Sequence, residues 1–576
     1  MTIRKVVLLL LPVLATVSRA APPDPELKTQ PGRAEIQASA QKAIRLMESS
    51  IGGFTAKIPC ASCHHNIQPQ WVLRMAANHG LAINEDQSRQ VALRSYSFLK
   101  DADSAIQGTH FVDPVMECAE FLAFGKEIGI APSITTALHA RRLASLQRKD
   151  GSWVTFDARP PQSSSPFMVT ALAVRTLNAY LPASLDQERA TRLSRARAWL
   201  EATPAISTED MTYRLLGLAW TDAPEKEIEA AAHQLQEAQR EDDGWAQTQA
   251  RKSDAYATGE ALVALKWTGR ASAEAFQNGI QFLINSQLED GSWIVETRLH
   301  EVAQISPPKM ETGFPHGENQ IMSMFGSTWA VAALSLALDI NEPPVQELPE
   351  LRPNAEEWIE TVAFGTPEQI AKIDPNVATK LGSTPLMIAA NDPAKVKALL
   401  NRGADPLAKA KSGQTALWIA ATYSGAAPGM RFLVEHGATA KPEPGIQFNS
   451  NPLVYAAYAN DIDSARVLLD AGASFTQAMM LEGFVRATPV MGAIQLDDVE
   501  LLREFLKRGL DPNMVDEVPL ISRAAIANRR EVTKVLLDAG ANPTQIDQYN
   551  WTPLRHTHGV DHDVNQTEDL ILNALK

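Results

Sequence analysis

Two cysteines and a histidine form the most reactive group of side chains in the sequence. They lie together in Cys60-Ala61-Ser62-Cys63-His64, a C-x-x-C-H sequence typical of covalent c-type haem attachment. Two thiols three residues apart reach both vinyl positions of one porphyrin edge, and the adjacent imidazole then reaches the iron from one face. The sequence therefore predicts haem c on Cys60 and Cys63, with His64 as the proximal iron ligand.

A second axial ligand would come from another loop. His316 and His110 each precede an expected apolar helix, so both are candidate distal ligands, and His316 is slightly favoured. His65 is expected to point away from His64. An open coordination position is the alternative, and it would favour small-molecule chemistry over electron transfer.

Other interpretations of the motif stay open. Zinc could bind Cys60, Cys63 and His64 or His65, although no second Cys or His pair follows at structural-zinc spacing. The two thiols could form a redox disulfide, although no thioredoxin-like βαβ pattern surrounds them, or the motif could hold no ligand. Cys118 lies among apolar residues and is expected to be a buried, inert thiol.

The N-terminus has the pattern of a secretory signal peptide. Arg4 and Lys5 precede an apolar run over residues 6–15, and Ser18 and Ala20 are the small residues of a cleavage site. We expect residues 1–20 to be removed and the mature protein to be exported, to the periplasm or the cell exterior. The apolar run is shorter than the ~20 residues that span a bilayer, and no membrane span is expected afterwards.

Composition limits the remaining function classes. The chain has 576 residues, 45% of them hydrophobic, and a formal net charge of -14. That length supports two to four domain cores. The acidic balance argues against binding of nucleic acid or of an anionic membrane, because both need a basic face. Three cysteines are too few for a disulfide framework.

Three similar turns indicate a helical repeat over residues 35–340. In each turn a Gln stands six residues before a Trp, and successive spacings of 92 and 48 fit a period near 46 with one degenerate copy at 195–220. An amphipathic helix precedes each turn and an alanine-rich helix follows it. The turns are QRKDGSW (147–153), QREDDGW (239–245) and QLEDGSW (287–293).

Extending this register predicts six helix pairs. The two earliest pairs are 35–47 with 68–78 and 90–99 with 113–125. A helix without a polar face must be buried on all sides, so the second helices should form an inner ring inside the first helices. We expect an α6/α6 toroid whose cavity mouth carries the Cys60–His64 loop.

The three turns resemble the QW motifs of terpenoid cyclases, and the expected ring is similar to that of squalene-hopene cyclases and protein prenyltransferases. The resemblance covers about 300 residues. In QW turns the glutamine caps a neighbouring helix and the indole packs beneath it. The resemblance implies a cavity for an apolar substrate.

The catalytic motifs of these families are missing. The cyclases' Asp-x-Asp-Asp acid motif has no match, and the prenyltransferases' zinc set is incomplete because no cysteine follows Asp254 at the required place. Asp254 and Glu260 could be cavity acids. A helix N-cap role for Ser253 or Asp254 is the alternative.

A proline-rich linker is predicted over residues 341–355, and a different repeat follows over 356–576. Six expected helix starts lie 30 to 37 residues apart, and GADP, GLDPN and GANP fit helix ends followed by turns. This pattern resembles ankyrin repeats, with about five clear units and a degenerate first unit at 356–373. The resemblance implies a protein partner, which such stacks usually bind on their concave face. His556, His558 and His562 are expected in a solvated tail.

The sequence thus predicts an all-α protein, an α6/α6 toroid followed by an ankyrin-repeat solenoid. The leading functional hypothesis is an exported c-type haem protein that transfers electrons with a partner held by the ankyrin repeats. A cyclase-like enzyme acting on an apolar substrate and a protein-interaction scaffold without chemistry are the alternatives. A wide apolar cavity with convergent acids would favour the enzyme, and a cavity filled by side chains would favour the scaffold.

Overall fold

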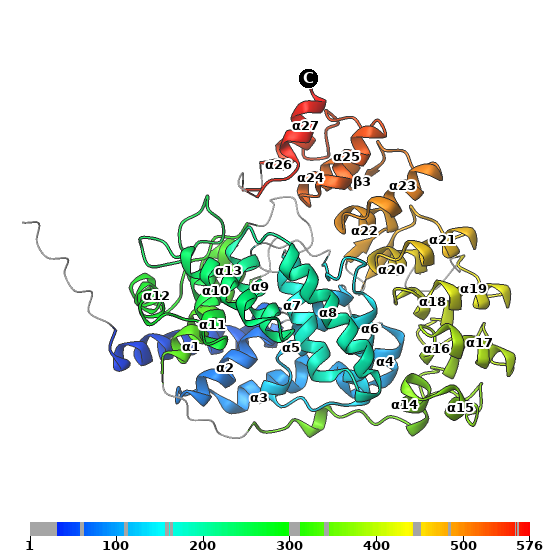
Figure 1. The fold of residues 1–576 in the computed structure, drawn as a ribbon, viewed down its shortest axis with the longest axis horizontal. Helices are drawn as coiled ribbons and strands as arrows, with labels where there is room; N and C mark the ends of the chain where they lie inside the picture. The colour runs from blue at the N-terminus through cyan, green and yellow to red at the C-terminus, as the bar shows by residue number, and fades with distance from the viewer. Residues whose placement is uncertain are drawn as a thin grey trace, which may run out of the picture.

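The computed structural model describes residues 31–57, 63–108, 113–155, 161, 165–298, 311–338, 345–441, 451–481, 485–558, 560–561 and 564–576. The predicted signal peptide at 1–20, Cys60 and His110 lie outside these ranges, and the side chain of Cys63 is not described. The described chain is mostly helical (Figure 1), as the all-α prediction requires. No helix within these ranges is both long and apolar enough to cross a lipid bilayer.

The first half of the chain, here called the helical domain, contains a helix at every position that the repeat predicts. A short helix, α4 (Ala102–Gln107), interrupts the second pair. The six pairs, first helix then second helix, are α1 (Arg33–Lys57) with α2 (Gln68–Asn78), α3 (Glu85–Ser95) with α5 (Pro114–Ala123), α6 (Ile134–Ser145) with α7 (Pro166–Tyr180), α8 (Asp186–Ala202) with α9 (Thr208–Trp220), α10 (Glu225–Glu237) with α11 (Ala255–Trp267), and α12 (Ala273–Ser286) with α13 (Gln320–Leu336).

The second helices of the pairs, here called the inner helices, form the core of this domain. In α11 every residue from Ala255 to Leu265 is buried, because an alanine-rich helix without a polar face gains by burial on all sides. Contacts between inner helices run from α2 through α13, α11, α9 and α7 to α5. From α5 they continue to the π-helical turn η1 (Cys63–Ile67), which leads into α2.

The three QW-type turns use the same hydrogen bonds. Each Trp is fully buried and its Nε1–H donates to a carbonyl ten residues earlier. Each Gln amide donates to a carbonyl in its own turn and to one in another first helix. The glutamines therefore tie repeat units together through carbonyl oxygens, whereas the resemblance predicts capping. The second acceptors are Arg192 in α8 for Gln147, Ala275 in α12 for Gln239 and Ser39 in α1 for Gln287.

The second half is a stack of two helical layers, visible as the curved right side of Figure 1. Glycines with φ between 84° and 96° follow five helices of the outer layer, as the repeat predicts. Two short hairpins, β1 (Met479–Leu481) with β2 (Val485–Ala487) and β3 (Val515–Asp516) with β4 (Val518–Pro519), interrupt the helices. A leading unit, α14 (Glu357–Phe364) and α15 (Pro367–Ile370), precedes both layers.

The inner layer consists of α16 (Pro385–Ile388), α18 (Ala416–Ala421), α20 (Pro452–Tyr458), α22 (Pro489–Gln495), α24 (Leu520–Ile526) and α26 (Pro553–Thr557). The outer layer consists of α17 (Pro393–Asn401), α19 (Ala427–Glu435), α21 (Ile462–Asp470), α23 (Val499–Lys507), α25 (Arg530–Asp538) and α27 (Glu568–Ala574).

Part of the predicted linker packs on the helical domain. Leu348 and Leu351 are buried in that domain's core, and the Leu348 N–H donates to the Gly129 carbonyl at 2.9 Å. Gly129 has a φ of +92°, and a Cβ there would lie 2.1 Å from the Gln346 carbonyl oxygen. Glycine is therefore required where this segment crosses the domain.

The prediction of a solvated histidine tail is wrong for His556. Its ring is fully buried in α26, and Nε2 lies 2.7 Å from Asp547 Oδ2. Burial lowers the pKa of His556 despite this carboxylate. His558 is exposed, and His562 lies outside the described residues.

Candidate functional site

The histidines of the C-x-x-C-H region lie in η1, between α1 and α2. His64 and His65 are both buried. The Phe54 ring stacks on His65 at a centroid distance of 4.8 Å and meets His64 edge-on at 5.3 Å. Phe325 of α13 lies 6.2 Å from His64. The expectation that His65 points away from His64 is wrong, because stacking on Phe54 turns its ring inward and the two Nδ1 atoms are in contact.

We assign the tautomers of both histidines from a chain of hydrogen bonds. Ser50 Oγ–H donates to the Thr312 carbonyl at 3.2 Å, so this oxygen accepts from His65 Nε2–H at 2.9 Å. His65 Nδ1 then carries a lone pair and accepts from His64 Nδ1–H. Burial lowers the pKa of His65 to about 3, which keeps this ring neutral. The lone pair of His64 is thereby placed on Nε2, the nitrogen that would bind a metal.

The other sequence-predicted residues are more scattered. His316 has a φ of +83°, and its Nε2 lies 2.7 Å from Ser292 Oγ in the third QW-type turn. Cys118 is buried, as predicted, with its Sγ 4.0 Å from His139 Nδ1. Within the described ranges, no group of three or more His, Cys, Asp or Glu side chains could hold a metal ion.

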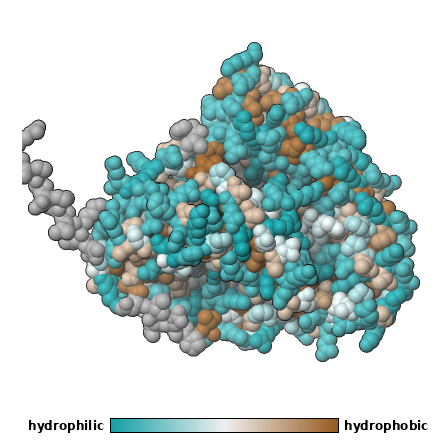
Figure 2. Space-filling view, in the orientation of Figure 1, coloured by the Kyte–Doolittle hydropathy of each residue, from teal (hydrophilic) through white to brown (hydrophobic). Residues whose placement is uncertain are grey.

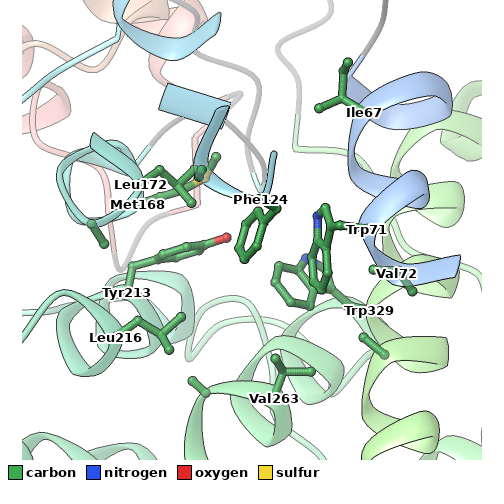
Figure 3. Close-up of a cluster of buried hydrophobic side chains, with 14 of the residues drawn as sticks. Ile67, Trp71, Val72, Phe124, Met168, Leu172, Tyr213, Leu216, Val263 and Trp329 are labelled. Carbon is green, nitrogen blue, oxygen red and sulfur yellow. The ribbon is translucent and has the colours of Figure 1, made fainter. Parts of the chain in front are cut away.

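The inner helices line a partly open cavity of about 20 Å³. Aromatic side chains meet beside it (Figure 3): Trp71 stacks on Phe124 at 4.4 Å and meets Trp329 edge-on at 5.6 Å. A volume of this size suits about one water molecule. The cavity is lined by Ile67, Gln68, Trp71, Glu120, Phe124, Met168, Leu172, Tyr213, Tyr256 and Trp329.

Buried acids occur on three of the inner helices, and one of them, Glu120, lines this cavity. Glu120 of α5, Glu209 of α9 and Glu260 of α11, together with Tyr213 and Tyr256, are here called the interior cluster. The Tyr256 hydroxyl donates to Glu209 Oε1 at 3.0 Å. Both oxygens of Glu260 are without a hydrogen-bond partner. Burial raises the pKa of Glu209 to about 8 and that of Glu260 well above its ordinary value.

The two acids singled out in the sequence have different roles. Asp254 is the N-cap of α11, since its side chain accepts from the Ala257 N–H at 3.0 Å, and the N-cap alternative is confirmed. Burial raises its pKa to about 6. Glu260 is buried in α11, but the acid that lines the cavity is Glu120. Glu120 and Glu209 were missed, because each shares its helix with a second acid, Glu117 in α5 and Asp210 in α9, and so carries no distinct signal.

The inner layer of the stack faces the helical domain. Ala102, Ala105 and Ile106 of the α4 region and Leu138 of α6 belong to the same apolar core as the stack. Arg142 of α6 is 1% exposed, lies over the Tyr423 ring at 4.9 Å and donates to the Ile106 carbonyl at 2.9 Å. Near α16 and α18 the inner layer is therefore covered by α4 and α6.

A charged contact joins the far end of the stack to the helical domain. Arg251 donates to both carboxylate oxygens of Asp561, from Nε at 2.7 Å and from Nη2 at 2.9 Å. Thr248 donates to the same carboxylate at 3.2 Å, and Arg298 lies 3.9 Å away. These groups lower the pKa of Asp561 despite the opposing effect of burial.

Comparison with known proteins supports the repeats of the second half. Residues 362–444 and 391–479 match the family described as "Ankyrin repeats (3 copies)", and no curated protein matches the chain. Similar solved structures include the human ASB11 ankyrin repeat domain (21% identity, 38% of this chain, 98% of that chain, TM-score 0.33). The Bcl-3 ankyrin repeat domain is 20% identical and covers 38% of this chain and 99% of that chain, with a TM-score of 0.31. An Acinetobacter baumannii AYE ankyrin repeat domain is 26% identical and covers 33% of this chain and 97% of that chain, with a TM-score of 0.28. Residues 362–479 therefore carry ankyrin repeats.

Proposed function

We propose that the protein is an interaction scaffold whose ankyrin repeats hold a protein partner. The observation that carries this proposal is a row of exposed apolar side chains on the loops that precede inner-layer helices. Such side chains cost free energy in water and mark interaction surfaces when they recur together. The row, here called the loop row, consists of Leu381, Leu407, Met480, Val515, Ile546 and Tyr549, each at least 36% exposed.

The loop row suits a partner better than the inner layer does, because α4 and α6 already pack against the inner layer. Figure 2 shows hydrophobic residues gathered on the upper part of the stack. The repetition of the row along successive units offers an extended strip, which is the kind of surface that repeat proteins use for binding.

Capture of partners by the full chain, with matched variants, tests the scaffold. The loop variant carries Leu407→Asp, Val515→Asp and Ile546→Asp, and the control carries Ile206→Asp, Leu288→Asp and Ile294→Asp, which are exposed on the helical domain. We expect one partner to cross-link to the wild type and the control but not to the loop variant. A partner retained by the loop variant, with unchanged circular dichroism, would reject this surface.

We further propose that the helical domain is a closed α6/α6 toroid that serves as the rigid base of the scaffold. Support comes from the cyclic order of inner-helix contacts and from Gln287, whose amide reaches the Ser39 carbonyl in α1 at 3.0 Å. The small volume of the cavity favours a scaffold over an enzyme for apolar substrates. Deletion of α1 should speed hydrogen exchange in α12 and α13, and an unchanged exchange would contradict closure.

Covalent haem is a second candidate function, because the hydrogen-bond chain through Ser50 and His65 leaves a lone pair on His64 Nε2. Phe54 and Phe325 surround His64 with apolar rings, which suit the face of a haem. Cys60 and Cys63 would attach the group and His64 would ligate the iron, with His316 or His110 as the second ligand. The group would supply one-electron redox chemistry, and export is proposed with it.

Expression with the c-type maturation machinery in an exporting host tests this candidate. The wild type and Cys118→Ala should retain haem on a denaturing gel, and Cys60→Ala with Cys63→Ala should not. The exported chain should begin after Ala20. A wild-type chain that carries zinc, or no haem, would reject the haem candidate and leave the scaffold unaffected.

A further inference from the structure

Lysines occupy equivalent positions on the first two loops of the loop row. Lys380 lies six residues after Asp374, and Lys411 lies six residues after Asp405. Each aspartate accepts a hydrogen bond from the backbone N–H two residues later, at 3.0 Å and 2.8 Å, so both loops begin with the same turn. Both lysines are exposed. The same position of two consecutive repeat units therefore carries a positive charge in water.

The two loops are in contact with each other. The Lys411 N–H donates to the Leu381 carbonyl at 2.9 Å. Leu381 is 36% exposed, and Leu407, in the same loop as Lys411, is 53% exposed. These two leucines, with Lys380 and Lys411, are here called the basic tip. Hydrogen-bonded neighbouring loops thus combine two positive charges with two apolar side chains on one exposed surface.

The charges of the basic tip are not neutralised within the stack, whereas those of some later arginines are. Arg466 lies 3.3 Å from Glu504, and Arg530 lies 2.8 Å from Asp569. No carboxylate within the described ranges pairs with either lysine of the basic tip. Charges of opposite sign on two binding surfaces favour their association and select the correct partner. The basic tip therefore favours a partner that brings carboxylates.

The sign of the charge changes along the loop row. Residues 372–382 and 402–414 contain five Lys or Arg and two Asp, although the whole chain has a net charge of -14. Residues 509–519 and 540–552 contain four Asp or Glu and no Lys or Arg, and Glu517 stands where the first two loops have lysine. An occupant of the whole row must therefore be acidic at one end only.

This polarity favours a protein segment over a nucleic acid. A nucleic acid carries negative charge along its whole length, so it would place phosphates against the acids of residues 509–552. It also has little to offer the exposed apolar side chains of the row, which gain most by contact with other apolar groups. A polypeptide can carry carboxylates at one end and apolar side chains throughout.

We propose that the partner held by the loop row presents an extended segment whose acidic end binds the basic tip. Its carboxylates lie between Lys380 and Lys411, beside Leu381, and its apolar side chains continue along the row toward Val515 and Ile546. This inference rests on the proposed scaffold function. The change of charge along the row fixes the direction in which the segment lies.

Fluorescence anisotropy with the full chain tests the proposal. Three labelled peptides of equal length alternate Leu with Glu, Leu with Gln, or Leu with Lys. The Glu peptide should bind the wild type about tenfold more tightly than the Gln peptide, because it forms two exposed ion pairs. Lys380→Glu with Lys411→Glu, here called the tip variant, should lose this preference. Lys507→Glu with Lys534→Glu, which reverses two exposed lysines of the outer layer, should keep it.

Three further results decide between explanations. The Lys peptide should bind the tip variant more tightly than the wild type, a gain that misfolding would not produce. Equal affinities of the wild type for the Glu and Gln peptides would overturn the acidic segment. Binding of an oligo(dT) strand as tightly as the Glu peptide would overturn it in favour of a site for polyanions in general.

Cross-linking of the natural partner separates this inference from the scaffold itself. A partner lost from both the tip variant and the loop variant supports the acidic segment. A partner lost from the loop variant but retained by the tip variant overturns the acidic segment and leaves the scaffold standing. A partner retained by both variants overturns the loop row as the binding surface, and the acidic segment with it.

Discussion

The helical domain and the ankyrin stack join their repeat units in different ways. In the stack each unit contacts its neighbours, and glycines with positive φ end the outer helices locally. In the helical domain the glutamines of the QW-type turns bond to other first helices, and the last of them reaches α1, 248 residues away. Damage should therefore remain local in the stack and spread through the helical domain.

Removing one indole should give the largest effect. Trp245 is fully buried and donates to the Leu235 carbonyl at 2.8 Å, so Trp245→Ala should lower the free energy of unfolding by about 3–5 kcal/mol. Hydrogen exchange should accelerate in all six inner helices. Leu417→Ala, at a fully buried position in α18, should accelerate exchange only in adjacent ankyrin units. If Trp245→Ala also accelerates exchange only locally, the two halves do not differ in how damage spreads.

The first QW-type turn should be the next most sensitive. Gly151 has a φ of +106°, and a Cβ there would lie 2.3 Å from the Arg195 carbonyl oxygen. Gly151→Ala adds backbone strain and pushes α8 away, so the free energy of unfolding should fall by about 2 kcal/mol or more. Chemical denaturation measures this loss. Gly403→Ala in the stack, at φ +84° with open space around the Cβ, should cost less.

The stability of the helical domain should depend on pH through Glu209. The pKa of Glu209 is about 8 in the folded domain against an ordinary value of 4.5, so the folded state holds a proton that the unfolded state has lost. Stability from this group is complete below pH ~4.5 and declines as pH rises through about 8. The Tm of the helical domain should fall between pH 6.5 and 8, and Glu209→Gln should reduce that fall. If the Tm of Glu209→Gln falls with pH as steeply as that of the wild type, Glu209 is not the group responsible.

The second QW-type turn offers a small gain. Asp243 occupies the place of Gly151 and has a φ of +70°, which a residue with a Cβ adopts at a cost. Asp243→Gly should raise the free energy of unfolding by up to about 1 kcal/mol, and the Tm should rise slightly with it. A lower Tm in differential scanning calorimetry would show that the aspartate side chain stabilises this turn more than glycine relieves it.

Much of the helical framework could be predicted because its signals are local. The Gln and Trp of each turn, the apolar inner helices and the ankyrin glycines recur at fixed spacing, and Asp254 lies at a helix start. The direction of His65 could not be predicted, since it depends on Ser50 and on Thr312, 262 residues beyond Ser50. The docking of α4 on the stack depends on contacts such as Gln107 with Ser383, 276 residues apart. Side chains that meet across such distances leave no periodic trace in the sequence.

The bond between Ser39 and Gln287 also sets an order of events during synthesis. Most repeat proteins can fold from any point as units emerge. Helix α1 can pack early on η1 and α3, but its contacts with α12, α13 and the third QW-type turn form only when that part of the chain has been made, 248 residues after Ser39 for Gln287. At about 5–20 residues per second, α1 waits for tens of seconds. Until then the apolar face of α1 is a target for chaperones. A chain truncated before residue 287 should be degraded although it keeps five of the six helix pairs, from α1 with α2 to α10 with α11.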